Sequence, residues 1–222
     1  MELELTSEEL LIADEIVAVC KRLYRRNCLA AADGNISFRV SDDRILMTPT
    51  GISKAFMHPQ EMALLDINGD VLIGKPSGER KMHLAVYRNC PQAKAVVHAH
   101  PPTAIAWSVA RPDLKELPSQ SLSEVILAAG SIPFASYARP GEEAMGTVLE
   151  EFLPEHRALI LSRHGALTWG ESLNEAWMGM ERIEHVSQIL MSAEKLGGMT
   201  MLPAEEITAL YELRKKLGPK LL

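Results

Sequence analysis

The stretch Ala95-Val96-Val97-His98-Ala99-His100-Pro101-Pro102 contains the two features around which this chain is organised, a short apolar strand and a pair of histidines. Small and β-branched residues without an internal glycine predict a β-strand, and the two prolines end it because proline cannot donate a ladder hydrogen bond. Alternate side chains of a strand share a face. His98 and His100 therefore point to one face together with Val96, and Val97 points to the other.

Two histidines with this spacing can bind one metal ion. Along a strand they lie about 6.5–7 Å apart, and both can converge on a cation whose bonds to nitrogen measure ~2.0–2.1 Å. The alternative is that both are polar residues on a solvated face of the sheet. A catalytic zinc site needs three protein ligands and an open position. His164 is the natural third ligand, because it too follows an apolar strand, at 158–161, and precedes a glycine.

The other histidines carry weaker signals. Three of them lie in loops or helices without partners at a strand end, and we interpret them as structural or surface residues: His58, His156 and His185. The role of His83 stays open, because it falls one helical turn after Glu79 and shares its face.

The composition is that of an ordinary globular protein. Of the 222 residues, 47% are hydrophobic and 23% are charged, and a chain of this length is expected to form a single domain over residues 1–222. The 23 basic and 29 acidic residues give a net charge of −6, and the few basic clusters lie on predicted helices. These features argue against a nucleic-acid-binding protein.

Neither a membrane segment nor secretion is expected. No stretch approaches the ~18 apolar residues of a membrane span, and the acidic start, Met1 to Glu4, lacks the basic and apolar regions of a signal peptide. The three cysteines are odd in number and lack Cys-x-x-Cys spacing. We therefore expect reduced, inert thiols in a cytoplasmic protein.

Local patterns predict that strands and helices alternate along the chain. Capping boxes at 6–9 and 172–175 predict a helix to about Arg26 and the longest helix, which Gly197-Gly198 closes. Other helices are expected near 79–89, 102–110, 121–129, from 141 and over 203–217, and strands within 33–39, 45–48, 62–66, 71–73, 95–100 and 158–161. Because several strands pair through hairpins, the sheet should be mixed or largely antiparallel, and the class is α/β in layers.

Three small turns have the features of an anion-binding site. Gly34-Asn35, Thr50-Gly51 and Ser77-Gly78 carry side-chain donors, and the last of them opens a helix, whose free amides favour a phosphate. Each signal is unspecific alone, since small polar residues occur in every turn. Glu79, in the first turn of that helix, is a candidate acid/base. The alternative is a surface glutamate that the helix dipole favours.

Five motifs together resemble the class II aldolase/adducin family, and they are most similar to its L-fuculose-1-phosphate aldolase branch. In order, they are Gly34-Asn35-Ile36-Ser37, Thr48-Pro49-Thr50-Gly51, Ser77-Gly78-Glu79, His98-Ala99-His100 and His164-Gly165. The resemblance spans residues 6 to 217. It implies a three-layer α/β/α sandwich around a mixed, largely antiparallel sheet, and a homotetramer with active sites between subunits.

The same resemblance implies roles for individual residues. Zinc, or another divalent metal, is expected on His98, His100 and His164, and Glu79 matches the family's catalytic acid/base. The phosphate of a small sugar phosphate is expected to be held by Asn35, Thr50, Gly51, Ser77 and Gly78. The implied reaction is retro-aldol cleavage of a short ketose 1-phosphate, such as L-fuculose 1-phosphate, to dihydroxyacetone phosphate and an aldehyde. The metal acts as a Lewis acid that stabilises the enediolate, and Glu79 moves the proton at the cleaved carbon.

Three positions depart from the aldolase pattern. Gly78 stands where the aldolases have a second serine, and Leu217 stands where they have a C-terminal tyrosine. Glu124 aligns with a tyrosine that the aldolase uses as a proton donor. A glutamate there resembles the methylthioribulose-phosphate dehydratase branch, which uses it as acid/base but lacks the glutamate found at Glu79. Glu124 is therefore the second candidate catalytic residue, and a related dehydratase, a 4-epimerase and a non-catalytic adducin-like module remain alternatives to an aldolase.

Overall fold

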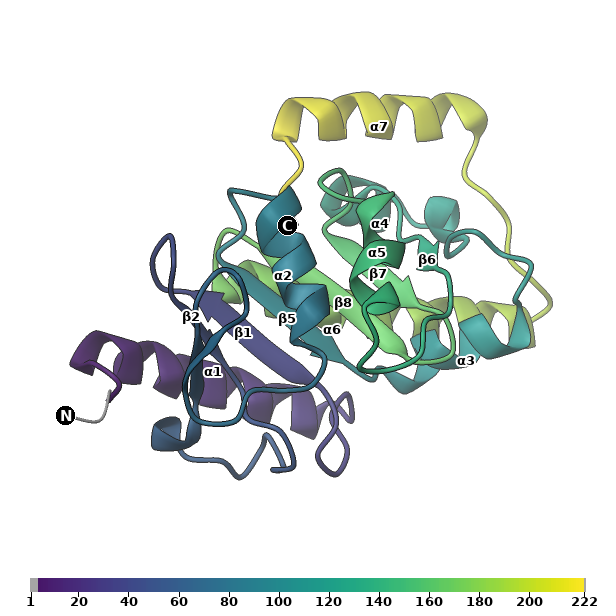
Figure 1. Ribbon diagram of the computed structural model, residues 1–222. Helices are drawn as coiled ribbons and strands as arrows, with labels where there is room; N and C mark the ends of the chain where they lie inside the picture. The colour runs from purple at the N-terminus through teal and green to yellow at the C-terminus, as the bar shows by residue number, and fades with distance from the viewer. Residues whose placement is uncertain (1–3, 222) are drawn as a thin grey trace.

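The computed structural model describes residues 4–221; Met1 to Leu3, which begin the acidic start noted above, and Leu222 lie outside the described residues. Within residues 4–221 the chain forms seven α-helices and one eight-stranded sheet with helices on both faces, and the last helix, α7, lies away from the sheet against α4 (Figure 1). The expected α/β sandwich is therefore confirmed. The helices are α1 (Ser7–Arg25), α2 (Arg80–Asn89), α3 (Pro102–Ala110), α4 (Ser123–Ala129), α5 (Ala144–Glu150), α6 (Leu173–Lys195) and α7 (Ala204–Leu217).

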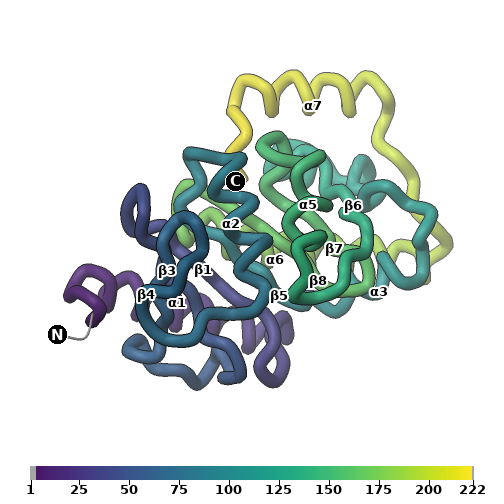
Figure 2. The backbone as a smooth tube through the Cα atoms, in the orientation of Figure 1, coloured from purple at the N-terminus to yellow at the C-terminus, as the bar shows by residue number. Residues whose placement is uncertain are grey.

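The sheet is mixed, as expected. Its strands are β1 (Asn35–Arg39), β2 (Ile45–Met47), β3 (Ala63–Leu65), β4 (Val71–Ile73), β5 (Ala95–Ala99), β6 (Phe134–Ala135), β7 (Ala158–Leu161) and β8 (Gly165–Gly170). They lie in the order β4-β3-β2-β1-β5-β8-β7-β6, and every neighbouring pair is antiparallel except β6 with β7. Figure 2 shows β3 and β4 near one edge of the molecule and β6 towards the opposite edge.

Strand β5 lies in the middle of the sheet, between β1 and β8. Asn35 of β1 stands opposite His98 in register, and Leu167 of β8 stands opposite His98 on the other side. Val97 belongs to the core formed with α1, α3 and α6, whereas Val96 belongs to the core formed with α2 and α5. The predicted alternation along this strand is therefore confirmed, and it places His98 on the side of α2.

The two predicted capping boxes differ in outcome. At the start of α1 the side chain of Thr6 accepts from the Glu9 N–H, and the Glu9 carboxylate accepts from the Thr6 N–H. At the start of α6 only the first half is present, because Ser172 accepts from the Glu175 N–H while the Glu175 carboxylate turns to Arg157. The ion pair of Glu175 with the buried Arg157 thus takes the place of a hydrogen bond from the Ser172 N–H to Glu175.

Strand β8 was missed, because only a glycine turn was expected after His164. Residues 165–170 instead pair with β7 on one side and with β5 on the other. The run is buried on both faces, so it lacks the alternation that marks a half-buried strand, and a glycine at each end looks like a turn. Helix α5 also begins at Ala144, three residues later than expected.

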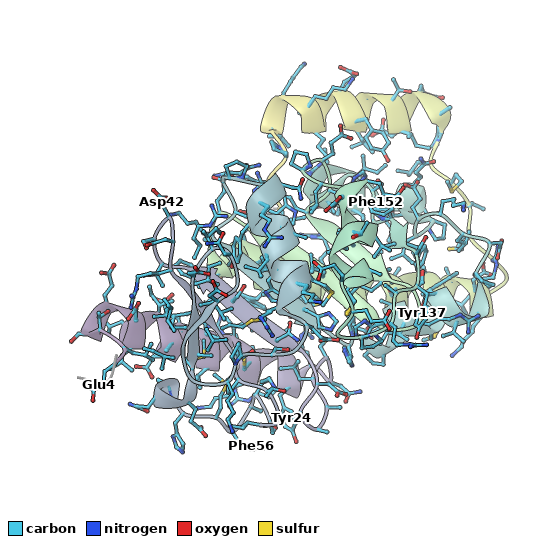
Figure 3. All side chains as sticks on the ribbon, viewed as in Figure 1. Glu4, Tyr24, Asp42, Phe56, Tyr137 and Phe152 are labelled. Atoms are coloured by element: carbon cyan, nitrogen blue, oxygen red, sulfur yellow. The ribbon has the colours of Figure 1, made fainter. Side chains whose placement is uncertain are left out.

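None of the helices in the described part of the chain is long and apolar enough to cross a membrane. The three cysteines are free and buried. Burial raises the pKa of Cys20 and of Cys28 to about 12, so both thiols stay protonated at neutral pH and are inert. At the surface, Tyr24 and Phe56 pack edge to face with ring centroids 5.4 Å apart, and both are exposed (Figure 3).

Candidate active site

Three histidines from neighbouring strand ends form one cluster. His98 lies on β5, His100 follows it, and His164 lies in the turn between β7 and β8. Their ring centroids are 4.8 to 5.1 Å apart. One ligand nitrogen from each lies within 4.8 Å of the other two. The structure therefore brings the three predicted metal ligands together.

Hydrogen bonds to the rings decide which nitrogens face the centre of the cluster. Nδ1 of His98 lies 2.9 Å from the carbonyl oxygen of Ala166, so Nδ1 carries the hydrogen and Nε2 keeps its lone pair. The Asp33 carboxylate lies 3.4 Å from Nδ1 of His100. The Nε2 atoms of His98 and His100 face each other at 3.1 Å. This donor set fits a divalent cation such as zinc.

Two glycines of the motifs are required by close packing around this cluster. A Cβ on Gly165 would lie 2.5 Å from the Ala99 carbonyl oxygen, 2.8 Å from Cε1 of His98 and 2.9 Å from Cδ2 of His100. Gly34 has a φ of +72°, and a Cβ there would lie 2.9 Å from the His98 carbonyl oxygen. A larger residue at position 165 would push against two histidine rings, and one at position 34 would press on the backbone of β5.

Glu79 is the carboxylate that contacts two of the three histidines. It is the N-cap residue of α2, and its two oxygens lie 3.3 Å from Nε2 of His98 and 3.1 Å from Nε2 of His164. Burial by itself raises the pKa of Glu79. The neighbouring His164 and His98 rings and the hydrogen bond from Asn35 outweigh that effect and hold the pKa well below its ordinary value. Glu79 is therefore an ionised carboxylate in the free protein.

Four of the five candidate phosphate ligands lie on two loops that backbone hydrogen bonds join, and the fifth, Asn35, begins β1. The Thr50 N–H donates to the Lys75 carbonyl at 3.0 Å, and the Ser77 N–H donates to the Thr48 carbonyl at 3.3 Å. A Cβ on Gly51 or Gly78 would meet nothing within 4 Å, so both loops have an open side. The five predicted residues are thus neighbours.

The side chain of Asn35 already makes hydrogen bonds within the protein. Its amide nitrogen donates to Ser77 Oγ at 3.0 Å and to Glu79 Oε2 at 2.8 Å. The residue is buried. In the free protein Asn35 therefore links the phosphate loop to the candidate acid/base.

A buried lysine beside these loops was not predicted. Lys54 Nζ donates to the Ala32 carbonyl at 2.8 Å and to the Ile52 carbonyl at 2.7 Å, so it ties the segment before Asn35 to the loop after Gly51. Burial lowers the pKa of Lys54. A lysine in a polar loop has the pattern of a surface residue, so the sequence contained no signal for its burial.

The remaining candidates lie apart from the cluster. Glu124 is exposed in the first turn of α4, and its side chain makes no hydrogen bond or ion pair within residues 4–221. One chain therefore does not bring Glu124 to the histidines. His58 and His185 are exposed, and His156 bonds to Ser131 at 3.1 Å, as expected of surface and structural histidines.

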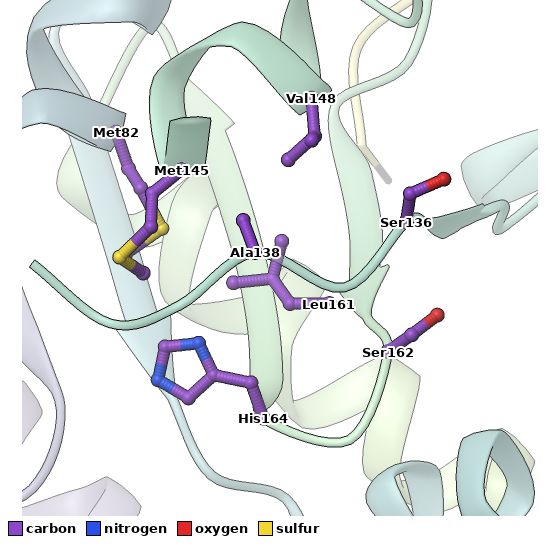
Figure 4. A pocket seen from close by; sticks show the side chains of 8 residues that line it. All are labelled: Met82, Ser136, Ala138, Met145, Val148, Leu161, Ser162 and His164. Carbon is purple, nitrogen blue, oxygen red and sulfur yellow. The ribbon is translucent and has the colours of Figure 1, made fainter. Parts of the chain in front are cut away.

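Next to His164 the site continues into a cavity of about 10 Å³, the space of a single water (Figure 4). Met82 of α2 and Met145 of α5 form one wall, and Ser136 and Ser162 lie on the other side. This side of the candidate metal site is therefore lined by apolar side chains and two hydroxyls.

The chain is similar to proteins of known family. A family model described as Class II Aldolase and Adducin N-terminal domain matches residues 14–191. The 3-oxo-tetronate 4-phosphate decarboxylase of Escherichia coli (strain K12) is 33% identical over 185 residues, which are 81% of this chain and 85% of that protein. The L-fuculose phosphate aldolase of Methanococcus maripaludis is 31% identical over 175 residues, which are 79% of this chain and 93% of that protein.

Solved structures are similar to this chain as well. YgbL from Escherichia coli has a TM-score of 0.86 and 30% identity, over 92% of this chain and 100% of that one. An L-fuculose 1-phosphate aldolase has a TM-score of 0.83 and 27% identity, over 96% of this chain and 98% of that one. The likeness therefore extends over almost the whole chain.

Proposed function

Since the chain belongs to the class II aldolase and adducin family, we propose that it is a divalent-metal-dependent lyase that releases dihydroxyacetone phosphate from a small phosphorylated sugar. The contact of Glu79 with both His98 and His164 carries this proposal. This contact places an ionised carboxylate beside the histidine cluster. Forming an enediolate and protonating it needs both a cation site and a group that carries a proton.

The histidines are proposed as the metal ligands, with zinc as the expected ion. Neutral imidazole nitrogens with an open fourth position are typical of catalytic zinc. A cation bound there supplies Lewis-acid stabilisation of negative charge on the carbonyl oxygen and the neighbouring oxygen of the substrate. His98, His100 and His164 hold their rings ready for it through the packing and hydrogen bonds described above.

The two loops are proposed to bind the substrate phosphate. The residues offered are Thr50, Gly51, Ser77 and Gly78, with Asn35 behind them, where its amide donates to Ser77. Support comes from the open side of both glycines, from the start of α2 and from the buried ammonium group of Lys54 next to the loops. A phosphate held there fixes the distance of the reacting carbon from Glu79, which is the usual role of binding energy remote from the reaction.

Glu79 is proposed to move one proton at the carbon whose bond is broken. In the synthetic direction its carboxylate removes a proton from the carbinol carbon of dihydroxyacetone phosphate. In cleavage the same proton returns to that carbon once the carbon–carbon bond has given its electron pair to the enediolate.

Aldol cleavage of a ketose 1-phosphate such as L-fuculose 1-phosphate is the first candidate. This reaction releases an aldehyde, so a second group must take the proton of the hydroxyl on the departing carbon. Glu124 is proposed for that role, from a neighbouring subunit, because one chain leaves it exposed and apart from the histidines.

Decarboxylation of a phosphorylated 3-oxo sugar acid is the second candidate. Loss of CO₂ from 3-oxo-tetronate 4-phosphate leaves the same enediolate, which takes one proton to give dihydroxyacetone phosphate. No proton transfer to the departing fragment is needed, because its carboxylate is already ionised. The relative at 33% identity favours this reaction, and so does the position of Glu124, which one chain leaves exposed and apart from the histidines.

We also propose a homotetramer with active sites between subunits, in the cytoplasm. Exposed apolar side chains support association: Tyr137 is 58% exposed, and Leu213 and Leu217 on α7 are 44% and 51% exposed. The free, buried cysteines support a reducing compartment. Light scattering at several protein concentrations measures the assembly.

The test supplies metal-loaded protein with L-fuculose 1-phosphate or 3-oxo-tetronate 4-phosphate and measures dihydroxyacetone phosphate by coupled reduction. The aldolase proposal expects equal amounts of lactaldehyde, and the decarboxylase proposal expects equal amounts of CO₂. Glu79→Gln with the same metal content serves as the control. Failure to release dihydroxyacetone phosphate from any sugar phosphate tried, together with loss of water from a substrate, would instead identify a dehydratase.

A further inference from the structure

Four buried polar side chains form a row behind Glu79. His83 and Tyr87 follow Glu79 along α2 at intervals of four residues, so the three share one face of the helix. Asn35 and Ser37 share one face of β1. The helix face and the strand face meet, and the four side chains behind Glu79 are each at most 2% exposed.

The hydrogen bonds of this row run in one direction. Both hydrogens of the Asn35 amide are used, towards Glu79 Oε2 at 2.8 Å and Ser77 Oγ at 3.0 Å. The amide oxygen of Asn35 therefore faces Nε2 of His83, at 2.6 Å, and that nitrogen must carry a hydrogen. A flipped amide would set its oxygen 2.8 Å from an ionised carboxylate, which is repulsive.

The rest of the row follows from the tautomer of His83. A neutral ring with its hydrogen on Nε2 has an acceptor at Nδ1. Ser37 lies 2.6 Å from Nδ1 and therefore donates its hydroxyl hydrogen to it. The Ser37 oxygen then accepts from the Tyr87 hydroxyl at 2.8 Å. Burial lowers the pKa of His83 to about 3, which agrees with a ring that stays neutral.

We propose that His83 is a positioning residue for proton transfer by Glu79, acting through the amide of Asn35. This inference rests on the proposed function of Glu79. Because the Nε2–H of His83 occupies the amide oxygen, Asn35 has one orientation available, and in that orientation both amide hydrogens point at Glu79 and Ser77. Without the donor, the amide is free to turn its oxygen towards them.

The same contacts exclude two other roles for His83. Both ring nitrogens are occupied, Nε2 by Asn35 and Nδ1 by Ser37. The ring therefore has no free lone pair for a metal ion. It also has no nitrogen open to a substrate proton, so it does not replace Glu79 as the acid/base.

The test compares His83→Gln with His83→Leu. A glutamine can place an amide N–H near the position of the ring Nε2–H, whereas leucine fills space without a donor. The measurement is the exchange of the carbinol hydrogen of dihydroxyacetone phosphate in D₂O, which reports Glu79 without any departing fragment. We expect His83→Leu to exchange about 10–100-fold more slowly with an unchanged zinc content, and His83→Gln to restore most of the rate.

Two controls separate positioning from folding. His156→Leu removes a hydrogen-bonded histidine away from the cluster and should leave exchange unchanged. The double variant Asn35→Ala with His83→Leu should be no slower than Asn35→Ala alone, because His83 acts only through that amide. Additive losses would contradict the proposal, and so would a folded His83→Leu protein that exchanges at the wild-type rate.

A nitrogen-15 spectrum of the histidine rings keeps the proposal falsifiable if His83→Leu does not fold. The hydrogen is expected on Nε2 of His83, and a hydrogen on Nδ1 would overturn the proposal. If the wild-type protein catalyses neither exchange nor cleavage, the proposed function fails and the positioning role fails with it. The spectrum still shows in that case whether the row of hydrogen bonds exists.

Discussion

At the scale of single residues, the account depends first on the three histidines. Replacing His98, His100 or His164 by alanine should lower zinc content and activity together, because two imidazoles hold a divalent ion poorly against water. Metal analysis of the purified variants, next to activity with added zinc, measures both. His185→Ala, on an exposed face, is the matched control. A metal-free but fully active His164→Ala protein would contradict the ligand assignment.

His83 makes a second prediction, on the pH dependence of stability. Its pKa falls from an ordinary 6.5 to about 3 on folding, because burial penalises the charged ring. Between these values the unfolded chain binds a proton that the folded chain does not. The free energy of unfolding should therefore fall as the pH falls from 6.5, by up to about 1.4 kcal/mol per pH unit from this residue.

Urea unfolding of the wild type and of His83→Gln at several pH values isolates this contribution. The wild type should lose stability more steeply below pH 6.5, and the two curves should run parallel above it. Parallel curves over the whole range would mean that His83 titrates in the folded protein as it does in the unfolded chain.

At the scale of elements, Gly165 connects β8 to the histidine cluster. Gly165→Ala should destabilise the protein by about 1–3 kcal/mol and weaken metal binding, because the new Cβ would meet the Ala99 backbone and two histidine rings. Gly78→Ala is the matched control for stability, since a Cβ there meets nothing within 4 Å. Thermal unfolding and zinc titration measure both effects. Normal stability and zinc affinity in Gly165→Ala would contradict this prediction, because they would show that the ends of β5 and β8 can move apart to make room for the new Cβ.

The sequence predicted most elements because their signals are local. The capping residue Thr6 and the alternation around His98 act over a few residues. Strand β8 escaped prediction because its identity depends on burial between β5 and β7, which are distant in sequence from each other. Hydrophobic periodicity does not reveal a strand that is buried on both faces, as β8 is.

The candidate site was predicted unevenly for the same reason. Histidines at strand ends and polar glycine turns are visible as spacing, so the cluster and the two loops could be anticipated. Lys54 and the partners of Asn35 depend on which loops meet in space. No pattern in the sequence distinguishes Lys54 from a surface lysine, although its ammonium group holds two loops together.

At the scale of the whole molecule, a buried ion pair fastens the end of the chain to the sheet. Arg157 bonds to Glu175 at 2.8 Å and stacks over the ring of Trp169, and Glu175 also accepts from the Leu221 N–H. Replacing Glu175 by alanine removes one of the two carboxylates that pair with the buried Arg157, and Glu171 remains as the other, at 3.0 Å. The loss should cost about 1–3 kcal/mol, which urea unfolding measures. Glu181→Ala, at a more exposed ion pair, should change stability by less than about 1 kcal/mol.

The structure of one chain does not show how subunits assemble. Glu124 lies apart from the histidines within residues 4–221, so the catalytic role proposed for it requires a neighbouring subunit. The alignment of motifs could point to Glu124, but no pattern within a single chain indicates which surfaces meet.

The central claim is that Glu79 transfers the proton at the carbon next to the carbonyl of dihydroxyacetone phosphate. Proton NMR of dihydroxyacetone phosphate in D₂O with zinc-loaded protein tests it without any assumption about the departing fragment. The wild type should exchange one carbinol hydrogen, and Glu79→Gln with equal zinc content should be slower by ~10²–10⁴-fold. A Glu79→Gln protein that binds zinc and exchanges at the wild-type rate would contradict the account.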